Sequence, residues 1–568
     1  MTKQIIPIDH QAPLNLEQLI LKNPTPVGES VPFDVLFVGA GPAGLSGAIH
    51  LAKLIKKHNE ASALPALGEI QIGVLDKAAN VGGHTLSGAV VNPRVLRELF
   101  PELKDSELPL RKKVEEDNVF FVTETSHFRL PTPPTMHNDG NYVASACEVV
   151  RFLGTKAEEL GVTILPSFAA ESLLTDGNAV TGVRTAAAGQ KRDGSPGPQY
   201  MPPTDITAKV TVLSDGTRSS LAQALYKWKD LSGDEPQIYA LGVKEIWRVK
   251  KAPRAVTHTL GYPVPRDAFG GSWLYPMADD MVSIGLVIGL DYRSHRLDVH
   301  KMLQRLKLHP LFAQYLEGGE IVEWGAKTIP EGGYKSLPKK MHADGIIVTG
   351  DAAGLVNVPA LKGIHYAMQS GVYAAETIFE ALKNNPQQTT LASSSLVSYD
   401  QKIRSSYIKD DLYKVRGMRQ AFKSGFFVGG AKAGLMTLTG GLFPEASHEH
   451  EDAAEPKEIT AADNSAAGAA AAAAASGPKI QQLSKVDAVY LAGNKTRDDI
   501  PQHLTVGADI SGDVADMYAA LCPAGVYERS GDKLVVNAPN CIDCKATDVL
   551  GPRWQPREGG AGPDYKLM

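Results

Sequence analysis

Hydrophobic runs that predict strands alternate with amphipathic stretches that predict helices along most of this chain. The apolar segment Val35 to Val38 is followed by a glycine-rich turn and then by the helical pattern GLSGAIHLAKLIKK. The segment EIQIGVLDK, which starts at Glu69, predicts a second strand. A strand, a glycine turn, a helix and a second strand in this order predict a βαβ unit, the opening of a parallel sheet.

The same alternation continues to about residue 415 and predicts an α/β domain with inserted pieces. Residues 155–168 predict a helix that runs into a strand, and residues 208–225 predict a strand, a turn and a helix. Residues 451–479 differ, because this Ala-rich stretch has few large apolar residues and cannot build a core of its own. We predict that it is a linker, although its alanine run favours transient helix.

The glycine turn fits the GxGxxG pattern of a phosphate-binding loop in its required context. Gly39, Gly41 and Gly44, with Pro42 and Ala43 between the last two, stand between the strand and the helix. Such glycines tighten the turn, let the backbone approach a pyrophosphate and let the helix pack on the strand. Asp76 ends the second strand and can accept hydrogen bonds from ribose hydroxyls, although it stands farther from Gly39 than the usual ~20 residues. The alternative is a glycine-rich turn that binds nothing.

Two later turns resemble the remaining motifs of the glutathione-reductase-like FAD enzymes. VLSDG contains Asp215 and Gly216, and GIIVTGDAAG contains Gly350 and Asp351. The resemblance implies that Asp351 holds the ribityl chain and that the next helix points its N-terminus at the isoalloxazine, where a positive helix end stabilises an anionic reduced flavin. Taken alone, the VLSDG turn is equally typical of an ordinary turn after a strand. The three motifs in this order indicate FAD.

Composition excludes several classes of protein and draws attention to the cysteines. The chain has 568 residues, enough for several domains, and its net charge of −5 argues against nucleic acid as the main partner. There are four cysteines, too few for a disulfide scaffold, and Cys522, Cys541 and Cys544 crowd the C-terminal end. This crowding indicates a metal site in a reducing compartment. CPAG and NCIDCK resemble ferredoxin cluster ligands, whereas a zinc site or spare thiols are the alternatives.

A wider set of motifs resembles one family, electron transfer flavoprotein-ubiquinone oxidoreductase (electron-transferring-flavoprotein dehydrogenase), from about residue 30 onward. They are HTLSG from His84, HTLG, GGSWLY, GLDY, NVP, Lys362-Gly363, CPAGVYE and EGGAGP. The resemblance implies a flavoprotein oxidoreductase that carries non-covalent FAD and a 4Fe-4S cluster. It further implies that the enzyme accepts single electrons from reduced electron transfer flavoprotein and reduces ubiquinone.

The resemblance also implies a set of site residues, none of which is an acid-base catalyst. For FAD they are Gly39, Gly41, Pro42, Ala43, Gly44, Asp76, Lys77, Gly83, His84, Asp215, Gly216, Gly350, Asp351, Lys362, Gly363 and Ile364. Gly270 and Gly271 would offer backbone hydrogen bonds to the quinone, although a glycine pair before aromatics is equally typical of a strand bend. His365 could shuttle protons to the quinone, but a lone histidine is more often structural.

The cluster ligands depart from the family pattern at one position. Cys522, Cys541 and Cys544 match it, but Thr547 stands where the fourth cysteine is expected. Three thiolates can hold a 3Fe-4S cluster, or a 4Fe-4S cluster whose fourth iron takes oxygen from Thr547, Asp548 or water. The third alternative is a degenerate, metal-free domain kept for packing or docking.

We predict an α/β fold in which a glutathione-reductase-like FAD domain is interleaved with a quinone-binding α+β domain, with a ferredoxin-like iron-sulfur domain at the C-terminus. The predicted segments are an N-terminal lead (1–30), the FAD domain (31–100, 141–220 and 336–415), the quinone and membrane domain (101–140 and 221–335), a membrane-interfacial segment (416–450), the linker (451–479) and the ferredoxin-like domain (480–568).

Membrane contact is predicted because basic residues between Lys402 and Lys432 lead into an apolar run that begins at Phe426. Such a run, broken by glycines, is typical of an interfacial helix near anionic headgroups, although a helix packed on the core has a similar pattern. Phe120, Phe121 and Phe128 form a second, weaker candidate face. No run of ~20 apolar residues or cleavable presequence is evident. We therefore expect a monotopic protein on the cytoplasmic face of a bacterial inner membrane rather than on the mitochondrial inner membrane.

Two other functions compete with this interpretation. A FAD-dependent reductase of lipid or isoprenoid substrates would share the FAD motifs and the membrane face but would need no cluster. A non-catalytic membrane docking flavoprotein would explain the missing cysteine as decay. Oxidation of the reduced flavin by a quinone or by a lipid alkene distinguishes these functions.

Overall fold

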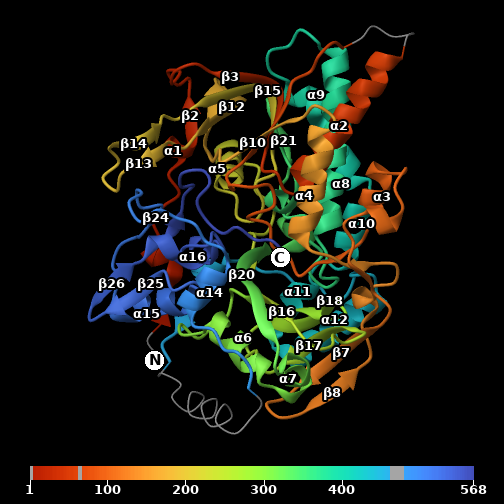
Figure 1. Cartoon of the computed structure of the whole chain (residues 1–568), viewed down its shortest axis with the longest axis vertical. Coiled ribbons are helices and arrows are strands. Elements are labelled where there is room, and N and C mark those ends of the chain that lie inside the picture. The colour runs from red at the N-terminus through yellow and green to blue at the C-terminus, as the bar shows by residue number, and fades with distance from the viewer. Residues whose placement is uncertain (1–3, 62–66, 461–478) are drawn as a thin grey trace.

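The computed structural model describes residues 4–61, 67–460 and 479–568, which form two large sheets with their helices and a small C-terminal unit (Figure 1). The sheet that contains the glycine turn lies in the upper half of Figure 1, the second sheet lies below it, and the C-terminal unit lies at the lower left. The alanine run at 461–478, within the predicted linker, lies outside the described residues.

The first sheet contains the βαβ unit predicted from the sequence. Its strand order is β10, β4, β3, β15, β12, β11, β2, with β22 also paired to β15 and to β21. Strand β3 runs parallel to both β4 and β15. The strands are β2 (Ile20–Lys22), β3 (Val31–Val38), β4 (Ile72–Asp76), β10 (Thr163–Pro166), β11 (Ala170–Asp176), β12 (Ala179–Thr185), β15 (Asp205–Leu213), β21 (His342–Ala343) and β22 (Ile346–Val348).

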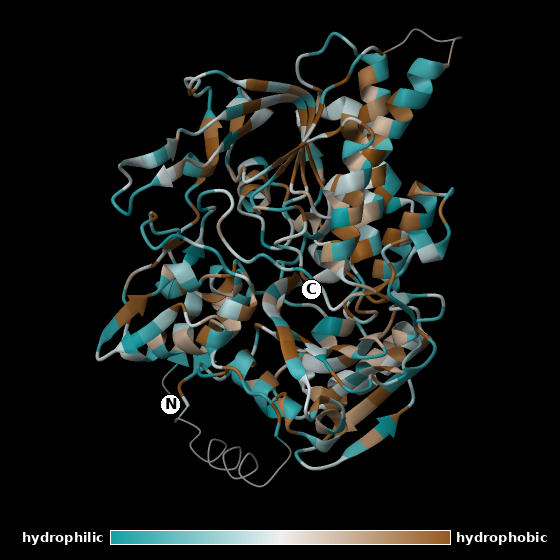
Figure 2. Cartoon of the chain, viewed as in Figure 1, coloured by the Kyte–Doolittle hydropathy of each residue, from teal (hydrophilic) through white to brown (hydrophobic). Residues whose placement is uncertain are grey.

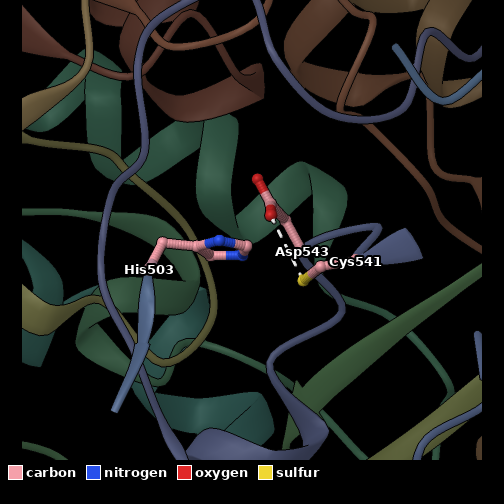
Figure 3. Close-up of side chains that lie close together, drawn as sticks. All are labelled: His503, Cys541 and Asp543. Atoms are coloured by element: carbon pink, nitrogen blue, oxygen red, sulfur yellow. Dashed lines mark hydrogen bonds between the residues drawn. The ribbon is translucent and has the colours of Figure 1, made fainter. Parts of the chain in front are cut away.

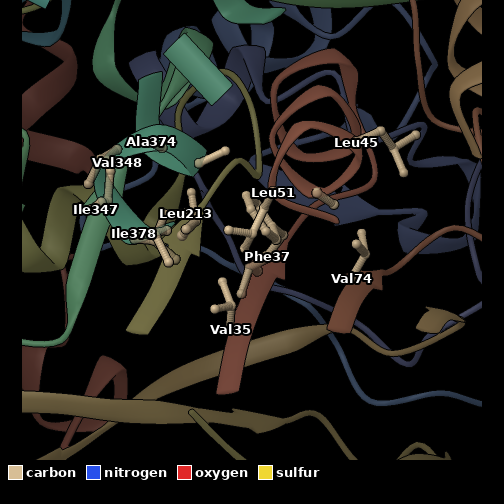
Figure 4. Close-up of a cluster of buried hydrophobic side chains, with 14 of the residues drawn as sticks. Val35, Phe37, Leu45, Leu51, Val74, Leu213, Ile347, Val348, Ala374 and Ile378 are labelled. Carbon is tan, nitrogen blue, oxygen red and sulfur yellow. The ribbon is translucent and has the colours of Figure 1, made fainter. Parts of the chain in front are cut away.

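Helices cover this sheet because its central strands are apolar on both faces. The side chains of Val35, Leu36 and Phe37 are fully buried, as expected of a parallel strand that lies between two layers. Figure 4 shows α2 and α8 side by side above β3, β15 and β22, and Figure 2 shows that the strands of this sheet are hydrophobic. The helices are α2 (Pro42–Glu60), α3 (Arg94–Leu99), α4 (Ala146–Glu158), α5 (Ser220–Lys229), α8 (Ile364–Asn384) and α9 (Ser393–Arg404).

Glycines allow α2 and α8 to approach closely. A Cβ atom on Gly371 would lie 2.0 Å from the carbonyl oxygen of Ala43, and one on Gly47 would lie 2.9 Å from the carbonyl oxygen of Gly371. Helix α2 starts at Pro42, whose missing N–H costs nothing at the first helical position. The close contact holds the N-terminus of α2 at the carboxyl end of β3, which is where the glycine turn must present its amides.

The second sheet has the order β20, β16, β19, β18, β17, β7, β8, and all neighbours are antiparallel except β17 and β7. Its strands are β7 (Asp117–Val122), β8 (His127–Leu130), β16 (Tyr239–Arg248), β17 (Val256–Gly261), β18 (Gly270–Ala278), β19 (Met281–Gly289) and β20 (Glu320–Pro330). Helix α6 (Val299–Lys307) packs on β16 and β19, and α7 (Pro310–Leu316) follows it. Segments from 117–130 and 239–330 therefore form one sheet.

Short elements connect these layers and close the molecule. They are β1 (Gln4–Ile5), α1 (Leu16–Leu19), β5 (Val90–Val91), β6 (Lys112–Lys113), β9 (Tyr142–Val143), β13 (Ala188–Gln190), β14 (Pro196–Met201), α10 (Tyr407–Lys414), α11 (Met418–Ala421), α12 (Phe426–Leu438) and β23 (Lys457–Glu458). Strands β5 and β6 pair with β9, and β13 pairs with β14. Within the part of the chain that the structure describes, no helix has both the length and the apolar character that a bilayer span needs.

The C-terminal unit is built from two short antiparallel strand pairs and three α-helices. Its elements are α14 (Lys485–Leu491), β24 (Leu504–Thr505), α15 (Gly512–Leu521), β25 (Tyr527–Ser530), β26 (Lys533–Val536), α16 (Ala546–Leu550) and β27 (Arg553–Trp554). Strand β24 pairs with β27, and β25 pairs with β26. The side-chain oxygen of Ser511 accepts from the amide of Val514 and caps α15, which ends directly before Cys522.

Parts of two segments that the sequence analysis predicted as the N-terminal lead and the linker pack against the sheets. Strand β2 from the N-terminal lead adds to the edge of the first sheet next to β11. Asp452, Ala453 and Lys457, from the start of the predicted linker, are buried. The buried Lys457 ammonium donates to the carbonyl oxygens of Leu290 and Tyr292, each at 2.7 Å, and Asp452 accepts from the amide of Tyr239. These bonds attach the segment to the second sheet.

Candidate functional site

A long cavity lies between the two sheets and collects most of the residues predicted to bind FAD. It is lined from the first sheet by Gly39, Gly41, Pro42, Ala43, Asp76, Lys77, His84, Asp215, Gly216, Gly350, Asp351, Lys362, Gly363 and Ile364. Residues of β16, β18, β19 and β20 form the opposite wall, among them Trp273, Tyr275 and Lys327. Of the residues predicted to bind FAD, Gly44 and Gly83 are not among those that line the cavity. The sequence thus indicated one wall of the cavity, and the opposite wall comes from the second sheet.

The glycine turn requires glycine at two positions for steric reasons. Gly39 has φ +108°, and a Cβ atom there would lie 2.5 Å from the carbonyl oxygen of Ser214. A Cβ atom on Gly44 would lie 2.1 Å from the carbonyl oxygen of Gly39, so Gly44 lets α2 pack on the turn. With Gly41 as its N-cap, α2 has no side-chain hydrogen bond at its first amides. These amides and the helix dipole are suited to a phosphate anion.

Asp76 is fixed at the end of β4 by backbone amides. One carboxylate oxygen accepts from the amide of Ala40 and the other from the amide of Ala78, each at 2.8 Å. Burial raises the pKa of Asp76, although these two amides and nearby Lys77 act to lower it. Each carboxylate oxygen keeps a further lone pair, so the group can still accept from a hydroxyl in the cavity.

Two buried polar atoms of the cavity lining find no hydrogen-bond partner within the described part of the chain. Among the described residues, Asp215 Oδ1 and His84 Nε2 make no hydrogen bond. Burial raises the pKa of Asp351 to about 6, with only Lys327 opposing it. Unpaired buried polar atoms are costly unless a ligand completes them. The cavity therefore fits a long polar cofactor with hydroxyl and phosphate groups, as FAD is.

The start of α8 also lines the cavity. Gly363 precedes the helix and gives no side-chain cap, so the amides of the first turn remain available. Burial lowers the pKa of Lys362 to about 8 and, with Lys362 as a second cause, that of His365 to about 3. His365 is therefore neutral at pH 7 and stacks on Tyr366 and Tyr407. This packing favours a structural role for His365 over a proton shuttle.

Gly270 and Gly271 begin β18 and do not line the long cavity. Gly271 pairs with Val287 across the sheet and shares a strand face with Trp273 and Tyr275, which do line it. A Cβ atom on Gly271 would lie 2.7 Å from the carbonyl oxygen of Thr259, so the strands approach too closely for a side chain. Tyr275 donates to or accepts from His258 Nε2 at 2.6 Å. Sequence reasoning missed Trp273 and Tyr275 as site residues, although they belong to the GGSWLY motif that begins with the glycine pair.

A second, smaller cavity in the C-terminal unit is lined by Cys522, Cys541, Cys544 and Thr547. Backbone amides point at the sulfurs: those of Ala524 and Val526 donate to Cys522, and that of Ala546 donates to Cys544. Burial raises the pKa of all three thiols, for Cys541 to about 12. Bound iron would have to displace their protons, as metal binding by thiols generally does. Converging buried sulfurs with amide donors fit an iron-sulfur cluster.

His503 and Asp543 lie next to this cavity without lining it. Figure 3 shows the His503 ring facing Cys541 and Asp543, and one potential ligand atom from each of the three lies within 4.8 Å of the others. Burial, chiefly, lowers the pKa of His503 to about 3, and among the described residues neither of its ring nitrogens has a hydrogen-bond partner. No motif in the sequence indicated His503, because it stands far from the cysteines.

The two cavities share a wall. Lys545 and Trp554 line both of them. The amide of Thr328 in β20, which lines the long cavity, donates to the carbonyl oxygen of Cys544 at 3.0 Å. Trp554 Nε1 donates to Asp543 at 3.1 Å, and Arg557 donates to the same carboxylate at 2.9 Å. The C-terminal unit is therefore attached directly to the cavity that fits FAD.

An exposed apolar surface is centred on α12, and we call it the α12 surface. It consists of Phe427, Val428, Leu435, Leu438, Leu442, Phe443 and, from β8, Phe128. Phe427 is 70% and Leu438 is 85% exposed. The Phe121 ring lies 5.5 Å from that of Phe426, so the two apolar faces predicted from the sequence adjoin. Contiguous exposed apolar residues mark an interaction site.

The basic residues predicted to accompany this surface are mostly engaged within the protein. Arg419 is buried and donates to Asp291 and Glu331, contrary to the interpretation that it lies near headgroups. Lys423 pairs with Glu455, and Lys402 pairs with Glu376. The tertiary partners of these cations lie far away in the chain, and for that reason the sequence pattern was misleading.

Comparison with known proteins gives matches in both parts of the site. Residues 239–329 match the family model described as ETF-QO, ubiquinone-binding, and residues 481–566 match that described as electron transfer flavoprotein-ubiquinone oxidoreductase, 4Fe-4S. The mitochondrial electron transfer flavoprotein-ubiquinone oxidoreductase of Arabidopsis thaliana is 36% identical, over 95% of this chain and 85% of that protein. The Homo sapiens protein of the same name is 35% identical over 94% and 89%.

A bacterial relative and a solved structure extend the comparison. A probable electron transfer flavoprotein-ubiquinone oxidoreductase of Acinetobacter baylyi is 34% identical, over 95% of this chain and 99% of that protein. The structure of a geranylgeranyl bacteriochlorophyll reductase-like protein from Thermoplasma acidophilum superposes with a TM-score of 0.53 at 17% identity, covering 79% of this chain and 97% of that one. At this identity the likeness shows the fold alone, and it confirms the predicted α/β class.

Proposed function

The chain belongs to the electron transfer flavoprotein-ubiquinone oxidoreductase family, and from this premise we infer its function. It is an oxidoreductase that accepts electrons from electron transfer flavoprotein and reduces ubiquinone. The observation that carries this conclusion is an identity of about 35% along nearly the whole chain, through the ubiquinone-binding and the iron-sulfur regions. FAD and an iron-sulfur cluster are its cofactors.

FAD binds in the long cavity, and each end of that cavity contributes different groups. The glycine turn and the start of α2 hold the pyrophosphate, and Asp76 accepts from the ribose. Asp351 and Asp215 accept from hydroxyl groups farther along, which supplies the partner that Asp215 Oδ1 lacks. The start of α8, with Lys362 and Gly363, faces the flavin ring. When bound, FAD supplies the conversion between one-electron donors and a two-electron acceptor.

Ubiquinone binds at the glycine end of β18, where Gly270 and Gly271 offer backbone groups. Gly271 shares its strand face with Trp273 and Tyr275, which supports a quinone ring that lies next to the flavin end of the long cavity. Phe269, directly before the pair, packs on Phe422 at 5.2 Å. Phe422 leads into α12, so the quinone site adjoins the α12 surface.

The α12 surface rests on a bilayer in this proposal, as a monotopic contact that dips into one leaflet. Ubiquinone is a membrane lipid, and an apolar surface next to its site lets the headgroup enter without crossing water. The relative from the bacterium Acinetobacter baylyi supports a bacterial protein, and for such a protein we propose the cytoplasmic face of the inner membrane as the location. Because Arg419 and Lys423 are paired with carboxylates within the protein, we expect the contact to be chiefly hydrophobic.

The membrane contact is tested by flotation with liposomes of neutral and of anionic lipid. The double variant Phe427→Asp/Leu438→Asp should abolish binding to both, and Val397→Asp, at an exposed apolar residue of α9, should not alter it. If the double variant floats with the liposomes as well as the wild type does, a membrane role for α12 is contradicted.

The cluster binds in the smaller cavity through Cys522, Cys541 and Cys544. The converging sulfurs and the amides that point at them support this assignment. The variant Cys544→Ala should lose cluster iron but keep its FAD, because the glycine turn belongs to the first sheet and Cys544 to the C-terminal unit. If Cys544→Ala retains its iron, the assignment of the cluster to this cavity is contradicted. The matched control is Cys147→Ala, which removes the thiol in α4.

The reaction itself is tested anaerobically with the full chain, reduced electron transfer flavoprotein and a soluble ubiquinone analogue. We expect flavin reduction by the partner, followed by quinol formation that is recorded by absorbance. Reoxidation of the reduced flavin by an isoprenoid alkene, but not by quinone, would instead indicate the lipid reductase. FAD binding without any turnover would indicate a docking protein.

A further inference from the structure

The cavity of the three cysteines has a fourth corner that is formed by a hydroxyl. Thr547 lines it together with Cys522, Cys541 and Cys544, and its side chain is buried. Thr547 is the second residue of α16, three positions after Cys544, so the start of the helix directs it toward the sulfurs. The hydroxyls of Thr547 and Tyr527 lie 3.3 Å apart and form a hydrogen bond.

No other thiol can reach this corner. The remaining cysteine of the chain, Cys147, belongs to α4 in the FAD-binding part. Its thiol donates to the carbonyl oxygen of Thr85 at 2.9 Å, and its amide donates to the carbonyl oxygen of Met568. These bonds hold Cys147 away from the C-terminal cavity.

The nearby carboxylates already accept hydrogen bonds within the protein, and Asp543 also accepts from the Cys541 thiol at 3.7 Å. Asp548 accepts from Arg218 Nε at 2.8 Å with one oxygen and from the amide of Trp554 at 2.9 Å with the other. Asp543 accepts from Trp554 and Arg557. Neither carboxylate lines the cysteine cavity.

His503 is the remaining rival ligand, because its ring nitrogens are unpaired among the described residues. It lies beside Cys541 but is absent from the lining that Thr547 shares with all three sulfurs. The residues that line the cavity therefore favour the Thr547 oxygen over a His503 nitrogen as the fourth ligand.

We propose that the fourth iron of the cluster is held by oxygen, from the Thr547 hydroxyl or a water bound to it, and that this iron can be removed and replaced. The inference rests on the proposed cluster site. A neutral oxygen is a harder and weaker ligand than thiolate for cluster iron, whereas the other three irons keep their thiolates. The Tyr527 hydroxyl holds the Thr547 oxygen, or its water, in the cavity.

This iron leaves when the cluster is oxidised by one electron. A one-electron oxidant takes one electron from the 4Fe-4S cluster of charge 2+, which becomes a 3Fe-4S cluster of charge 1+ and releases one Fe²⁺. Fe²⁺ and one electron from a reductant restore the starting cluster. No Fe–S(Cys) bond is broken, because the iron that leaves is the one without a cysteine.

The experiment uses the full chain, purified anaerobically with its cofactors. Ferricyanide is added, small molecules are removed, iron is counted and the electron paramagnetic resonance spectrum is recorded. We expect one iron in four to be lost and the signal of an oxidised 3Fe-4S cluster to appear. Dithionite with ⁵⁷Fe²⁺ should then restore the four-iron cluster, and Mössbauer spectra should show the label at one site only.

Matched variants assign this behaviour to residue 547. Thr547→Cys should keep all its iron under the same treatment, because the fourth corner is then a thiolate. Thr505→Cys adds a thiol at an exposed residue of β24 outside the cavity and should lose iron as the wild type does. Thr547→Ser keeps the oxygen and should also behave as the wild type.

Two results would overturn the inference without touching the cluster site. One is a wild type that keeps its four irons as firmly as Thr547→Cys, and the other is a nitrogen coupling on the cluster that disappears in His503→Ala. Equal iron in Cys544→Ala and the wild type, or no iron in any variant, would instead show that the cluster site is wrong. If Thr547→Cys does not fold, the ⁵⁷Fe labelling of the wild type decides.

Discussion

Lys77 and Asp543 form an ion pair although they are 466 residues apart in the chain. Lys77 follows the aspartate that ends β4 and lines the long cavity, and Asp543 stands between the two cysteines of the CxxC segment. Burial would raise the pKa of Asp543, but Arg557 and Lys77 outweigh it and hold that pKa well below its usual range. A charged pair therefore links the first sheet to the loop that carries Cys541 and Cys544.

We predict that Asp543→Asn destabilises the protein strongly. Asp543 is buried, and its loss leaves the Arg557 guanidinium and the Lys77 ammonium without their anion. Removing one partner of a buried pair costs about 3–5 kcal/mol. Urea unfolding should show this decrease relative to Asp509→Asn, an exposed aspartate in the same unit. Equal unfolding curves for both variants would show that the pair does not hold the units together.

Gly39→Ala should abolish FAD binding. The new Cβ atom would lie 2.5 Å from the Ser214 carbonyl oxygen, at a φ of +108° that an alanine rarely adopts. The turn must then move away from the position that presents the helix amides to phosphate. FAD per protein is measured by absorbance after purification. Gly434→Ala, in α12 with open space around it, should keep stoichiometric FAD, and loss of FAD in both variants would point to general misfolding.

Gly271→Ala should impair ubiquinone reduction more than flavin reduction. Its Cβ atom would press on the Thr259 carbonyl oxygen at 2.7 Å and displace the start of β18. A displacement of this kind at a substrate site costs about 10- to 100-fold in rate. Stopped-flow traces should show normal flavin reduction by electron transfer flavoprotein and slow reoxidation by quinone. If both phases slow together, Gly271 serves the sheet rather than the quinone.

Asp351 gives a pH dependence that can be measured on the FAD-free protein. Burial raises its pKa in the folded state to about 6, above the value of about 3.8 for a free side chain. As pH rises between these values, the unfolded state loses its proton first, so stability should fall across pH 4 to 6. The fall amounts to about 3 kcal/mol for a shift of two pKa units.

The variant Asp351→Asn isolates that contribution. Its stability should lack this fall, so the difference between the variant and the wild type should grow from pH 4 to pH 6 and then stay constant. Unfolding curves at five or six pH values measure it, and a difference that does not change with pH would contradict the assignment. FAD affinity should decrease at the same time, because an amide is a weaker acceptor than a carboxylate for a ribityl hydroxyl.

Local motifs explain why the sequence could indicate most of the residues that line one wall of the long cavity. The glycine turn, the aspartate that ends β4 and the Gly-Asp turn before α8 each combine a strand, a turn and a helix within one short stretch. The opposite wall, with Trp273 and Tyr275, could not be placed in this way. Its strands carry no phosphate-binding pattern, and they reach the cavity only because the second sheet packs against the first.

The sequence alone indicated the cofactors of this protein, because glycine spacing, terminal aspartates and cysteine spacing are local constraints on which ligands a turn can hold. Its resemblance to the family also indicated that Thr547 stands where a fourth cysteine is expected. Only the tertiary structure decided the partners of each charge and the neighbours of each cavity. Arg419 is buried against Asp291 and Glu331, and Lys77 meets Asp543, because contacts between residues far apart in the chain depend on how whole layers pack, and no local pattern records that packing.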